Sequence, residues 1–340
     1  MLSVDNQPFP NHGRYIFVFT EKNTKLAKTA FTMRFRKNKF YREGAFHHLY
    51  IKAKNGNVIF YRIEDYLFIY TLASVLSRRH KVIVELFCVM FNHLHGCVKA
   101  RTQGVFRAFL RDLSSLFTVG YNEEYHLTGS LLLPCGYAPK VSAKTHKTCL
   151  IYIANNPSTG RLVKSVLDYK WGLVPYFFSD HPFSEKLVKR NARFAMRQAL
   201  SIVDGCKRRG QYLNYPILRK ILKKLNSREK AQIVDYIIIK YFFLDKQSFF
   251  SHFESEEKAL VAMDSSAGSE HDLYEPWEDY SVYLEMISAT LSSGLDYKMF
   301  RFHQMPADQL NILRNKLSRL PGVTKIHIER FLHLNDVIWK

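Results

Sequence analysis

The chain has few cysteines, and those it has do not form closely spaced pairs. Five of its 340 residues are cysteine, an odd number, and they are scattered between Cys88 and Cys206. This pattern excludes a disulfide-stapled scaffold and a zinc knuckle built on a CxxC pair. It favours a reducing, intracellular setting for the protein.

Long apolar runs are scarce as well. The longest, at residues 82–91 and 236–244, contain Glu85 and Lys240, and they fall short of the roughly 20 residues that cross a bilayer. The N-terminal text MLSVDNQPFPNHGRY lacks the charged start and apolar core of a signal peptide. We therefore expect no membrane association and a cytoplasmic location.

Acidic residues are few relative to basic ones. The 50 Lys and Arg against 30 Asp and Glu give a net charge of +20 and a sequence pI near 9.7. An excess of this size indicates a polyanionic partner, and the alternative is a cationic protein that simply stays soluble. Nine acidic residues fall within residues 254–280, which we interpret as a solvated loop or linker.

The first half of the chain mixes two kinds of pattern. Residues 14–20 and 46–53 are rich in aromatic and β-branched residues, which predicts strands. Residues 65–79 and 104–125 have apolar residues at helical spacing, and VIVELFCVMFNHLHGCV between them predicts one long strand or two short ones. Intermixed helices and strands predict an α+β sandwich. Beyond residue 180, segments such as ILRKILKKLN have apolar residues at helical spacing, which predicts a mostly helical second part.

Residues 307–334 contain two helical patterns joined by LPGVT. A short turn with glycine between amphipathic helices is typical of a helix-turn-helix. Its second helix is expected to expose Lys325, His327 and Arg330 to a groove of nucleic acid. A plain helical hairpin packed in a core is the alternative.

Two histidines stand two residues apart in the strand-like text VMFNHLHGCVKA. A strand points residues i and i+2 to the same face, so His93 and His95 can converge on one ion or one phosphate oxygen. Cys97 shares their face, which makes a His/His/Cys zinc set conceivable. We favour a hard divalent metal because no second cysteine stands near. Ordinary hydrogen-bonded core histidines are the alternative.

Five segments resemble, in order, the segments of one protein family. They are FHHLYIKAKNGNVIF, EDYLFIYTLASVL, VMFNHLHGCVKA, YNEEYHLTGSLL and YIANNPSTGRLVKSVLDYKWGLVPYF, and they cover about residues 46–176. Their order and spacing are similar to those of the HUH single-tyrosine transposases, especially the REP-associated tyrosine transposases. The NHLH and YIANNP segments are specific when taken together.

The resemblance implies a ferredoxin-like HUH domain, with an antiparallel sheet and flanking helices, over residues 1–180. A basic helical DNA-binding domain would follow over residues 181–340. The implied function is that of a DNA transposase and single-strand endonuclease that binds hairpin, REP-like DNA in a bacterial cytoplasm, associated with the nucleoid. Such a protein is expected to be a monomer or a homodimer.

The resemblance also implies the chemistry of DNA cleavage. His93 and His95 would hold Mg²⁺ or Mn²⁺ with a third polar ligand, and the ion would draw charge from the scissile phosphate. A tyrosine on the following helix would attack phosphorus, leaving a 5′-phosphotyrosine intermediate and a free 3′-OH for rejoining.

This sequence departs from the family at the expected nucleophile, because our alignment places Phe117 where the tyrosine belongs. Three interpretations follow. Phe117 is an engineered Tyr→Phe change, the chain is a natural binding-only relative, or Tyr121, one turn further on, is the nucleophile. Asn122 is then the nearest candidate for the third metal ligand, and His48 is an alternative neighbour of the site.

Basic residues interleaved with aromatic ones indicate contacts with single-stranded DNA, because cations hold phosphates while aromatic rings stack on bases. The predicted DNA-binding residues are Arg34, Arg36, Lys37, Lys39, Arg42, Arg78, Arg79, Lys325 and Arg330. Solvated surface charges are the alternative for each of them. For the whole chain, the alternatives are a DNA-hairpin-binding protein that does not cleave and an RNA-binding regulatory protein.

Overall fold

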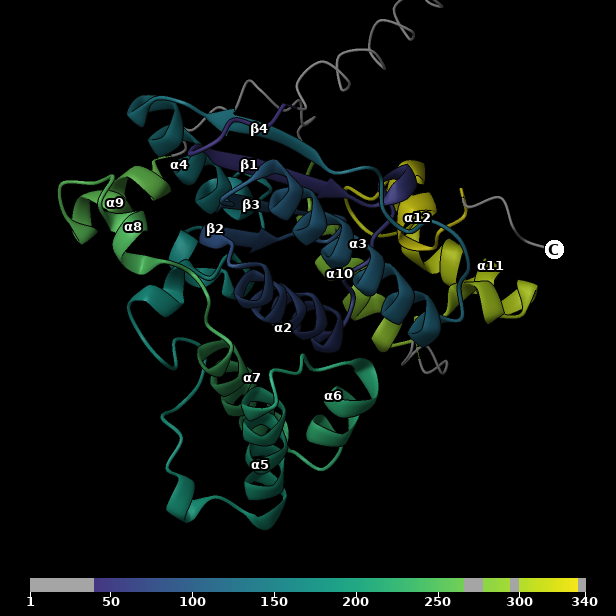
Figure 1. Ribbon diagram of the computed structural model, residues 1–340. Helices are drawn as coiled ribbons and strands as arrows, with labels where there is room; N and C mark the ends of the chain where they lie inside the picture. The colour runs from purple at the N-terminus through teal and green to yellow at the C-terminus, as the bar shows by residue number, and fades with distance from the viewer. Residues whose placement is uncertain (1–39, 266–277, 294–299, 336–340) are drawn as a thin grey trace, which may run out of the picture. The chain divides into compact units, whose positions relative to one another are not determined.

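Four strands form one antiparallel sheet with the order β2-β3-β1-β4 (Figure 1). A computed structural model describes residues 40–265, 278–293 and 300–335. The strands are β1 (Phe46–Lys52), β2 (Ile83–Val89), β3 (His93–Lys99) and β4 (Gly136–Lys140). Helix α2 (Ile63–His80) connects β1 to β2, and α3 (Gln103–Tyr125) connects β3 to β4. This strand order and connectivity are those of the ferredoxin-like fold, which confirms the predicted α+β class.

The register of the two central strands decides which side chains share a face. β1 pairs Tyr50 with His95 and His48 with Cys97. Residues directly opposite one another in a ladder lie on the same face, and neighbours along a strand alternate. One face of the sheet therefore carries His48, Tyr50, His95 and Cys97, and the other face carries His47 and its neighbours at every second position.

Helices cover the two faces separately. Phe106 of α3 packs on His47 with ring centroids 4.8 Å apart, so α3 covers the face that carries His47. Tyr152 of α4 (Ala143–Thr159) lies 5.7 Å from His48 by ring centroids, so α4 covers the opposite face. α4 begins at Ser142, whose side chain accepts a hydrogen bond from the backbone N–H of Thr145 in a capping box.

The remaining chain is mostly helical, as the sequence predicts. Short 3₁₀ turns occur at Lys54–Gly56, Val166–Asp168, Lys170–Gly172, Val174–Phe177, Lys189–Asn191 and Phe302–Gln304. The helices are α5 (Phe194–Arg208), α6 (Tyr215–Leu222), α7 (Ser227–Lys240), α8 (Lys246–Phe250), α9 (Glu256–Asp264), α10 (Ser281–Leu291), α11 (Ala307–Leu317) and α12 (Lys325–Phe331).

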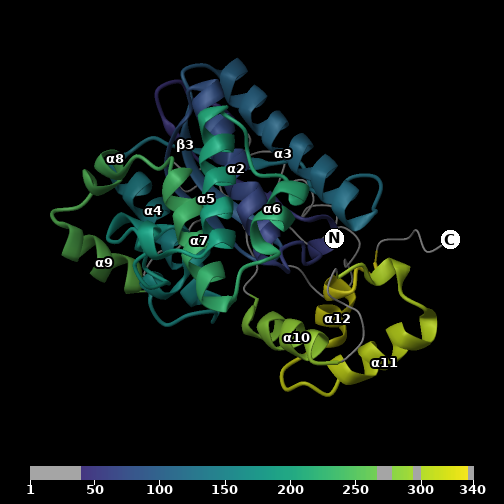
Figure 2. The same cartoon turned by 90° about the horizontal axis from the view of Figure 1, so that it is seen from below.

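These helices pack in three groups. α5 contacts both α6 and α7, and α6 and α7 lie against α2 (Figure 2). α8 contacts β2, and α9 contacts α4. α10 contacts α11 and α12. The described residues all belong to the unit that spans residues 38–340, and the predicted domain boundary at residue 180 stays a prediction.

Most of the predicted elements are present in the described part of the chain. The strand at 46–53 and the helices at 65–79 and 104–125 are confirmed as β1, α2 and α3. The long apolar text forms two strands, β2 and β3, that pair with each other. The predicted strand at 14–20 lies outside the described residues.

Two predictions need correction. The acidic stretch that we interpreted as a solvated loop contains helix α9, which begins at Ser255 with a side-chain cap and buries Ala259 and Met263. The two helices near the C-terminus exist, but seven residues separate α11 from α12, more than the tight turn of a helix-turn-helix. Among the described helices, we find none with the length and apolar character needed to cross a membrane.

Candidate functional site

The two histidines of β3 lie on one face of the sheet, as the strand period requires. The ring centroids of His93 and His95 are 4.9 Å apart, and the rings are nearly perpendicular. Each residue is about 1% exposed. The two imidazoles thus form the centre of a buried polar cluster between the sheet and α4.

The hydrogen bonds of His93 determine which of its ring nitrogens carries the lone pair. Asn92 donates its amide N–H to the carbonyl of Gly56 at 3.1 Å, which turns its Oδ1 toward Nδ1 of His93 at 2.7 Å. An amide oxygen only accepts, so Nδ1 of His93 carries the proton. Its Nε2 therefore presents a lone pair, as a metal ligand must.

His95 is oriented by a second histidine. Its Nδ1 lies 2.9 Å from Nε2 of His48, and its Nε2 lies 3.3 Å from the side-chain amide of Asn156. Rotation of that amide by 180° exchanges its nitrogen and oxygen, so the same position can present an oxygen ligand. A histidine that binds a metal through one ring nitrogen usually has a polar partner on the other, and His48 takes that place at Nδ1 of His95.

Helix α4 brings a tyrosine to the same place. Tyr152 and Asn156 are four residues apart and therefore lie on one side of the helix. The Tyr152 ring is 5.5 Å from His95 by centroids, and Tyr152 is half-buried, whereas both histidines are buried. Neither residue is among the site residues predicted from the sequence, although both stand in the motif YIANNP. Their helical spacing was the signal that could have found them.

Two further tyrosines enclose the histidine pair. Tyr50 stacks on His95 with centroids 5.0 Å apart, and the Tyr280 hydroxyl lies 3.5 Å from Nδ1 of His93. Tyr50 and Tyr280 are each 4% exposed. Tyr280 is fixed by a backbone hydrogen bond to Gly160 at 3.0 Å. The site is therefore covered on the side of α10.

The residues predicted as nucleophile and third ligand lie elsewhere, which corrects our alignment. Phe117 and Tyr121 are on α3, on the other side of the sheet from His93 and His95. Phe117 packs on Phe60 and is 1% exposed. The Asn122 amide donates to the carbonyl of Gly129 at 2.9 Å. The aromatic spacing of α3 reflects core packing, and the structure does not bring these three residues to the histidine pair.

Of the predicted DNA-binding residues, four lie outside the described residues: Arg34, Arg36, Lys37 and Lys39. Arg42, Arg78 and Arg79 are exposed.

The predicted recognition helix is less open than expected. Lys325 is exposed, but Arg330 is bound to Glu278 at 2.8 Å and its side chain is only 21% exposed. His327 is also half-buried. The expectation that all three cations of this helix face solvent is therefore wrong for Arg330 and His327.

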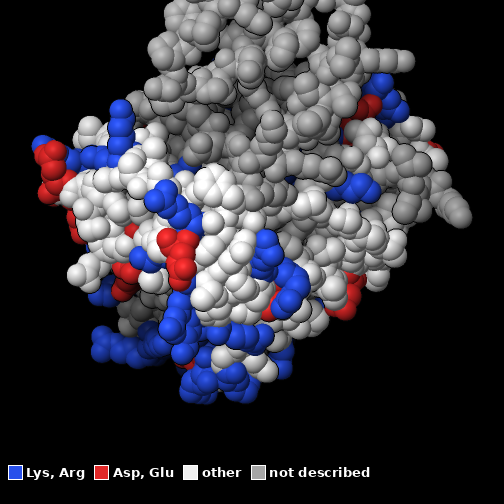
Figure 3. Space-filling model, turned by 45° about the horizontal axis from the view of Figure 1, so that its top comes forward, with Lys and Arg blue, Asp and Glu red and all other residues white. Residues whose placement is uncertain are grey.

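A stronger concentration of positive charge lies on the α5–α7 helices. Residues 186–230 contain 14 Lys and Arg but only two acidic residues. Figure 3 shows blue side chains gathered at the lower end of the face that it draws. The exposed lysines of this region include Lys220, Lys223 and Lys224, on and just after α6.

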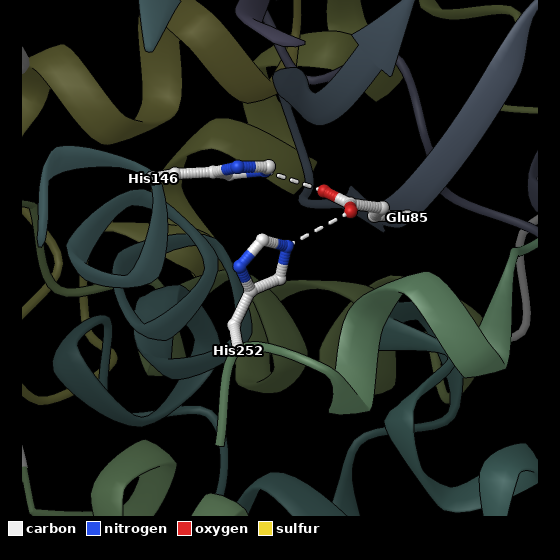
Figure 4. Close-up of side chains that lie close together, drawn as sticks. All are labelled: Glu85, His146 and His252. Atoms are coloured by element: carbon white, nitrogen blue, oxygen red, sulfur yellow. Dashed lines mark hydrogen bonds and ion pairs between the residues drawn. The ribbon is translucent and has the colours of Figure 1, made fainter. Parts of the chain in front are cut away.

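A second polar cluster lies near the outer edge of the same sheet. Glu85 of β2 stands between His146 of α4 and His252, which follows α8 (Figure 4). One ligand atom from each of these three residues lies within 4.8 Å of the other two. This cluster is a candidate metal site distinct from the His93/His95 pair.

Comparison with known proteins adds one distant likeness. A solved structure of a REP-associated tyrosine transposase bound to a REP hairpin is similar to this chain, with 16% sequence identity and a TM-score of 0.36. The similarity covers 41% of this chain and 82% of that chain. No family model matches the chain. No curated protein matches it either. Function is therefore inferred from the side chains of the site themselves.

Proposed function

We propose that the chain is a metal-dependent transposase-type endonuclease that cleaves and rejoins single-stranded or hairpin DNA, with Tyr152 as its nucleophile. One observation carries the proposal. A half-buried tyrosine and an amide from α4 meet two histidines from β3, on the face of the sheet that α3 does not cover. The motifs of the sequence and its positive charge support DNA as the substrate.

His93, His95 and Asn156 would hold the metal. Both histidine nitrogens that face the site are Nε2 atoms, and neutral imidazoles leave the double charge of a cation undiminished. Imidazole is a softer ligand than carboxylate, so this donor set fits Mn²⁺ better than Mg²⁺. When bound, the cation acts as a Lewis acid on the scissile phosphate.

Tyr152 would carry the covalent step. Its hydroxyl loses a proton to solvent, and the oxygen forms a bond to phosphorus. The bond from phosphorus to the 3′ oxygen breaks, and that oxygen takes up a proton to become a free 3′-OH. The 5′-phosphate stays on Tyr152, and the reverse reaction rejoins the strand. His48 touches none of these atoms and acts as a positioning residue for His95.

A DNA-hairpin-binding protein that does not cleave is the second candidate. It is favoured by the burial of His93 and His95, which are each about 1% exposed. A phosphate reaches these rings only if Tyr280 or Tyr152 moves aside, since both lie against them. The two candidates make opposite predictions about a covalent product.

The test is a covalent-adduct assay on single-stranded hairpin DNA with Mn²⁺. The DNA is labelled at its 3′ end, because the proposed reaction leaves the protein on the 5′ end of the downstream fragment. The wild-type chain should form a labelled protein band that resists denaturation. Tyr152→Phe should abolish the band, since the ring remains but the attacking oxygen is gone.

Tyr121→Phe is the matched control, because it removes one hydroxyl from a buried tyrosine on α3. This variant should keep the adduct, and Phe117→Tyr should not increase it. Loss of the adduct in Tyr121→Phe but not in Tyr152→Phe would return the nucleophile to α3. If the wild-type chain binds the hairpin tightly and forms no adduct under any condition, the non-cleaving candidate is correct.

A further inference from the structure

Three potential metal ligands meet where β2 and β3 lie under α4, and a fourth, Cys97, lies beside two of them. The Glu85 carboxylate is 2.5 Å from Nε2 of His146 and 3.0 Å from Nε2 of His252. The Cys97 sulfur lies 3.6 Å from the same carboxylate and 3.5 Å from Nε2 of His146. Figure 4 shows the Glu85 carboxylate directed at both rings.

The backbone directs Glu85 into this cluster. The pairing of β2 with β3 shifts register between Val84 and Leu86, so Glu85 is the extra residue of a β-bulge. A bulge changes the direction of a side chain relative to the regular alternation. Glu85 is thereby buried completely, with 0% exposure, on the face that Cys97 occupies.

The four residues come from separate parts of the chain. Glu85 and Cys97 belong to neighbouring strands, His146 lies in the first turns of α4, and His252 follows α8. The backbone N–H of Asp245, the residue that caps α8, donates to the carbonyl of Val84 at 2.7 Å. The cluster thus stands where the chain after α7 returns to the edge of the sheet.

Burial by itself raises the pKa of the Glu85 carboxyl group. Hydrogen bonds from His146 and Ser248 outweigh burial and leave that pKa below its ordinary value. The Ser248 hydroxyl donates to the carboxylate at 2.5 Å. Three side chains thus direct hydrogen bonds at this buried carboxylate and hold it in one orientation.

The donor types fit a zinc ion, and so does the spacing of Cys97 and His146. Imidazole nitrogen, thiolate sulfur and carboxylate oxygen are the ligands that Zn²⁺ takes in tetrahedral sites. With ordinary bond lengths, a ligating sulfur and nitrogen lie about 3.5 Å apart, which matches the 3.5 Å between Cys97 and His146. The short His146–Glu85 contact would open to about 3.3 Å on binding.

We propose that Glu85, Cys97, His146 and His252 form a structural Zn²⁺ site that fastens the chain after α8 to the sheet. All four ligand positions are filled by protein, as in structural rather than catalytic zinc sites. Binding releases the Cys97 proton, and each ring moves its proton from Nε2, where it is donated to Glu85, to Nδ1, so that Nε2 presents a lone pair to the ion. Ser248 remains as the hydrogen-bond partner that orients the carboxylate.

The site is separate from the proposed endonuclease site. His95 and Cys97 are both on β3, but they use different ligand partners from α4, namely Asn156 and His146. Zinc binding therefore does not depend on whether the chain cleaves DNA. The two metal sites can be distinguished by mutation.

The test is the metal content of the full-length chain, purified without a metal-affinity step and dialysed against metal-free buffer. We expect about one zinc per chain by mass spectrometry. His252→Gln should lose this zinc, although glutamine can still donate a hydrogen bond to Glu85. A purely hydrogen-bonded cluster would tolerate that change, and a metal site would not.

His80→Gln is the matched control, because His80 also pairs with a carboxylate, Asp112, at 2.9 Å and is similarly exposed. It should retain the zinc, and so should His95→Ala, which removes a ligand of the other site. Zinc that is lost in His95→Ala but kept in His252→Gln would overturn the proposal.

Measurements on the wild-type chain keep the proposal testable if a variant does not fold. A strong chelator should lower its Tm, and added Zn²⁺, but not Mg²⁺, should restore it. Cobalt substituted for zinc should give a thiolate charge-transfer band that Cys97→Ser lacks. The proposal would be wrong if the wild-type chain held no zinc after incubation with Zn²⁺ and if the chelator left its Tm unchanged.

Discussion

Neighbouring histidines of β1 show how one residue type takes two roles. His48 faces α4 and holds His95 by a hydrogen bond, whereas His47 faces α3 and is packed among aromatic rings. Tyr41 stacks on His47 with centroids 4.9 Å apart. The backbone N–H of Arg42 donates to Nε2 of His47 at 3.0 Å. The His47 ring is thus packed in the core, and its Nε2 accepts a hydrogen bond, as a neutral imidazole can.

This packing predicts an acid-sensitive contribution to stability. Burial is the main reason that the pKa of His47 falls from 6.5 to about 4. Between these values the unfolded chain binds the proton and the folded chain does not, so stability is lost as the pH falls from about 6.5 toward 4. The loss attributable to His47 is at most about 3 kcal/mol.

Urea unfolding between pH 4 and 7 checks this prediction. In His47→Gln an amide oxygen can still accept the Arg42 N–H, but no group titrates. The variant should lose less free energy of unfolding than the wild-type chain over this range. Parallel pH profiles for the two proteins would assign the acid sensitivity to other groups.

At the scale of elements, Asp65 connects three helices. It lies in the first turn of α2 and is completely buried. Its carboxylate accepts hydrogen bonds at 2.9 Å from Tyr125 of α3 and from Tyr215 of α6. The backbone N–H of Arg62 donates to the same group at 2.8 Å. The Asp65 side chain therefore caps α2 and links that helix to both α3 and α6.

Asp65→Ala should be strongly destabilising. It leaves the buried hydroxyls of Tyr125 and Tyr215 without their acceptor, whereas the Arg62 guanidinium keeps Glu124 at 2.8 Å. Each buried hydroxyl left without a partner costs about 1–3 kcal/mol. Asp168→Ala is the control, because Asp168 accepts the Ser165 backbone N–H in an exposed capping box. That variant should lose only about 1 kcal/mol. Equal losses in urea unfolding would contradict the role of Asp65.

Local patterns in the sequence predict the elements well but not the partners of each side chain. The alternation of β1 and the apolar spacing of α2 and α3 are visible within some twenty residues, and the structure confirms all three. The sequence pattern led us to expect a nucleophile on α3, which lies away from the histidine pair, because an aromatic stripe has the same spacing whether it packs in the core or lines a site. The Glu85 cluster depends on a bulge and on side chains as far apart in the sequence as Glu85 and His252, which no local pattern encodes.

At the scale of the whole molecule, charge is distributed unevenly. Two acidic residues in the described part of the C-terminal region lie beside cations of that region, because Glu278 binds Arg330 and Glu329 lies 3.7 Å from Lys325. Residues 186–230 have seven times as many basic as acidic residues, 14 against two. The α5–α7 surface therefore offers a stronger attraction to phosphates than the α11–α12 hairpin (Figure 3).

The salt dependence of DNA binding distinguishes the two surfaces. Removal of one cation that neutralises a phosphate should lower the slope of log K against log salt by about 0.7 for single strands. The triple variant Lys220→Gln, Lys223→Gln, Lys224→Gln should weaken hairpin binding and lower this slope by about 2. The matched variant Arg314→Gln, Arg319→Gln, Lys325→Gln removes three exposed cations from the α11–α12 region of the protein. It should change the slope less. A larger change in the second variant would mean that the phosphates are held at the C-terminal helices, as the helix-turn-helix prediction requires.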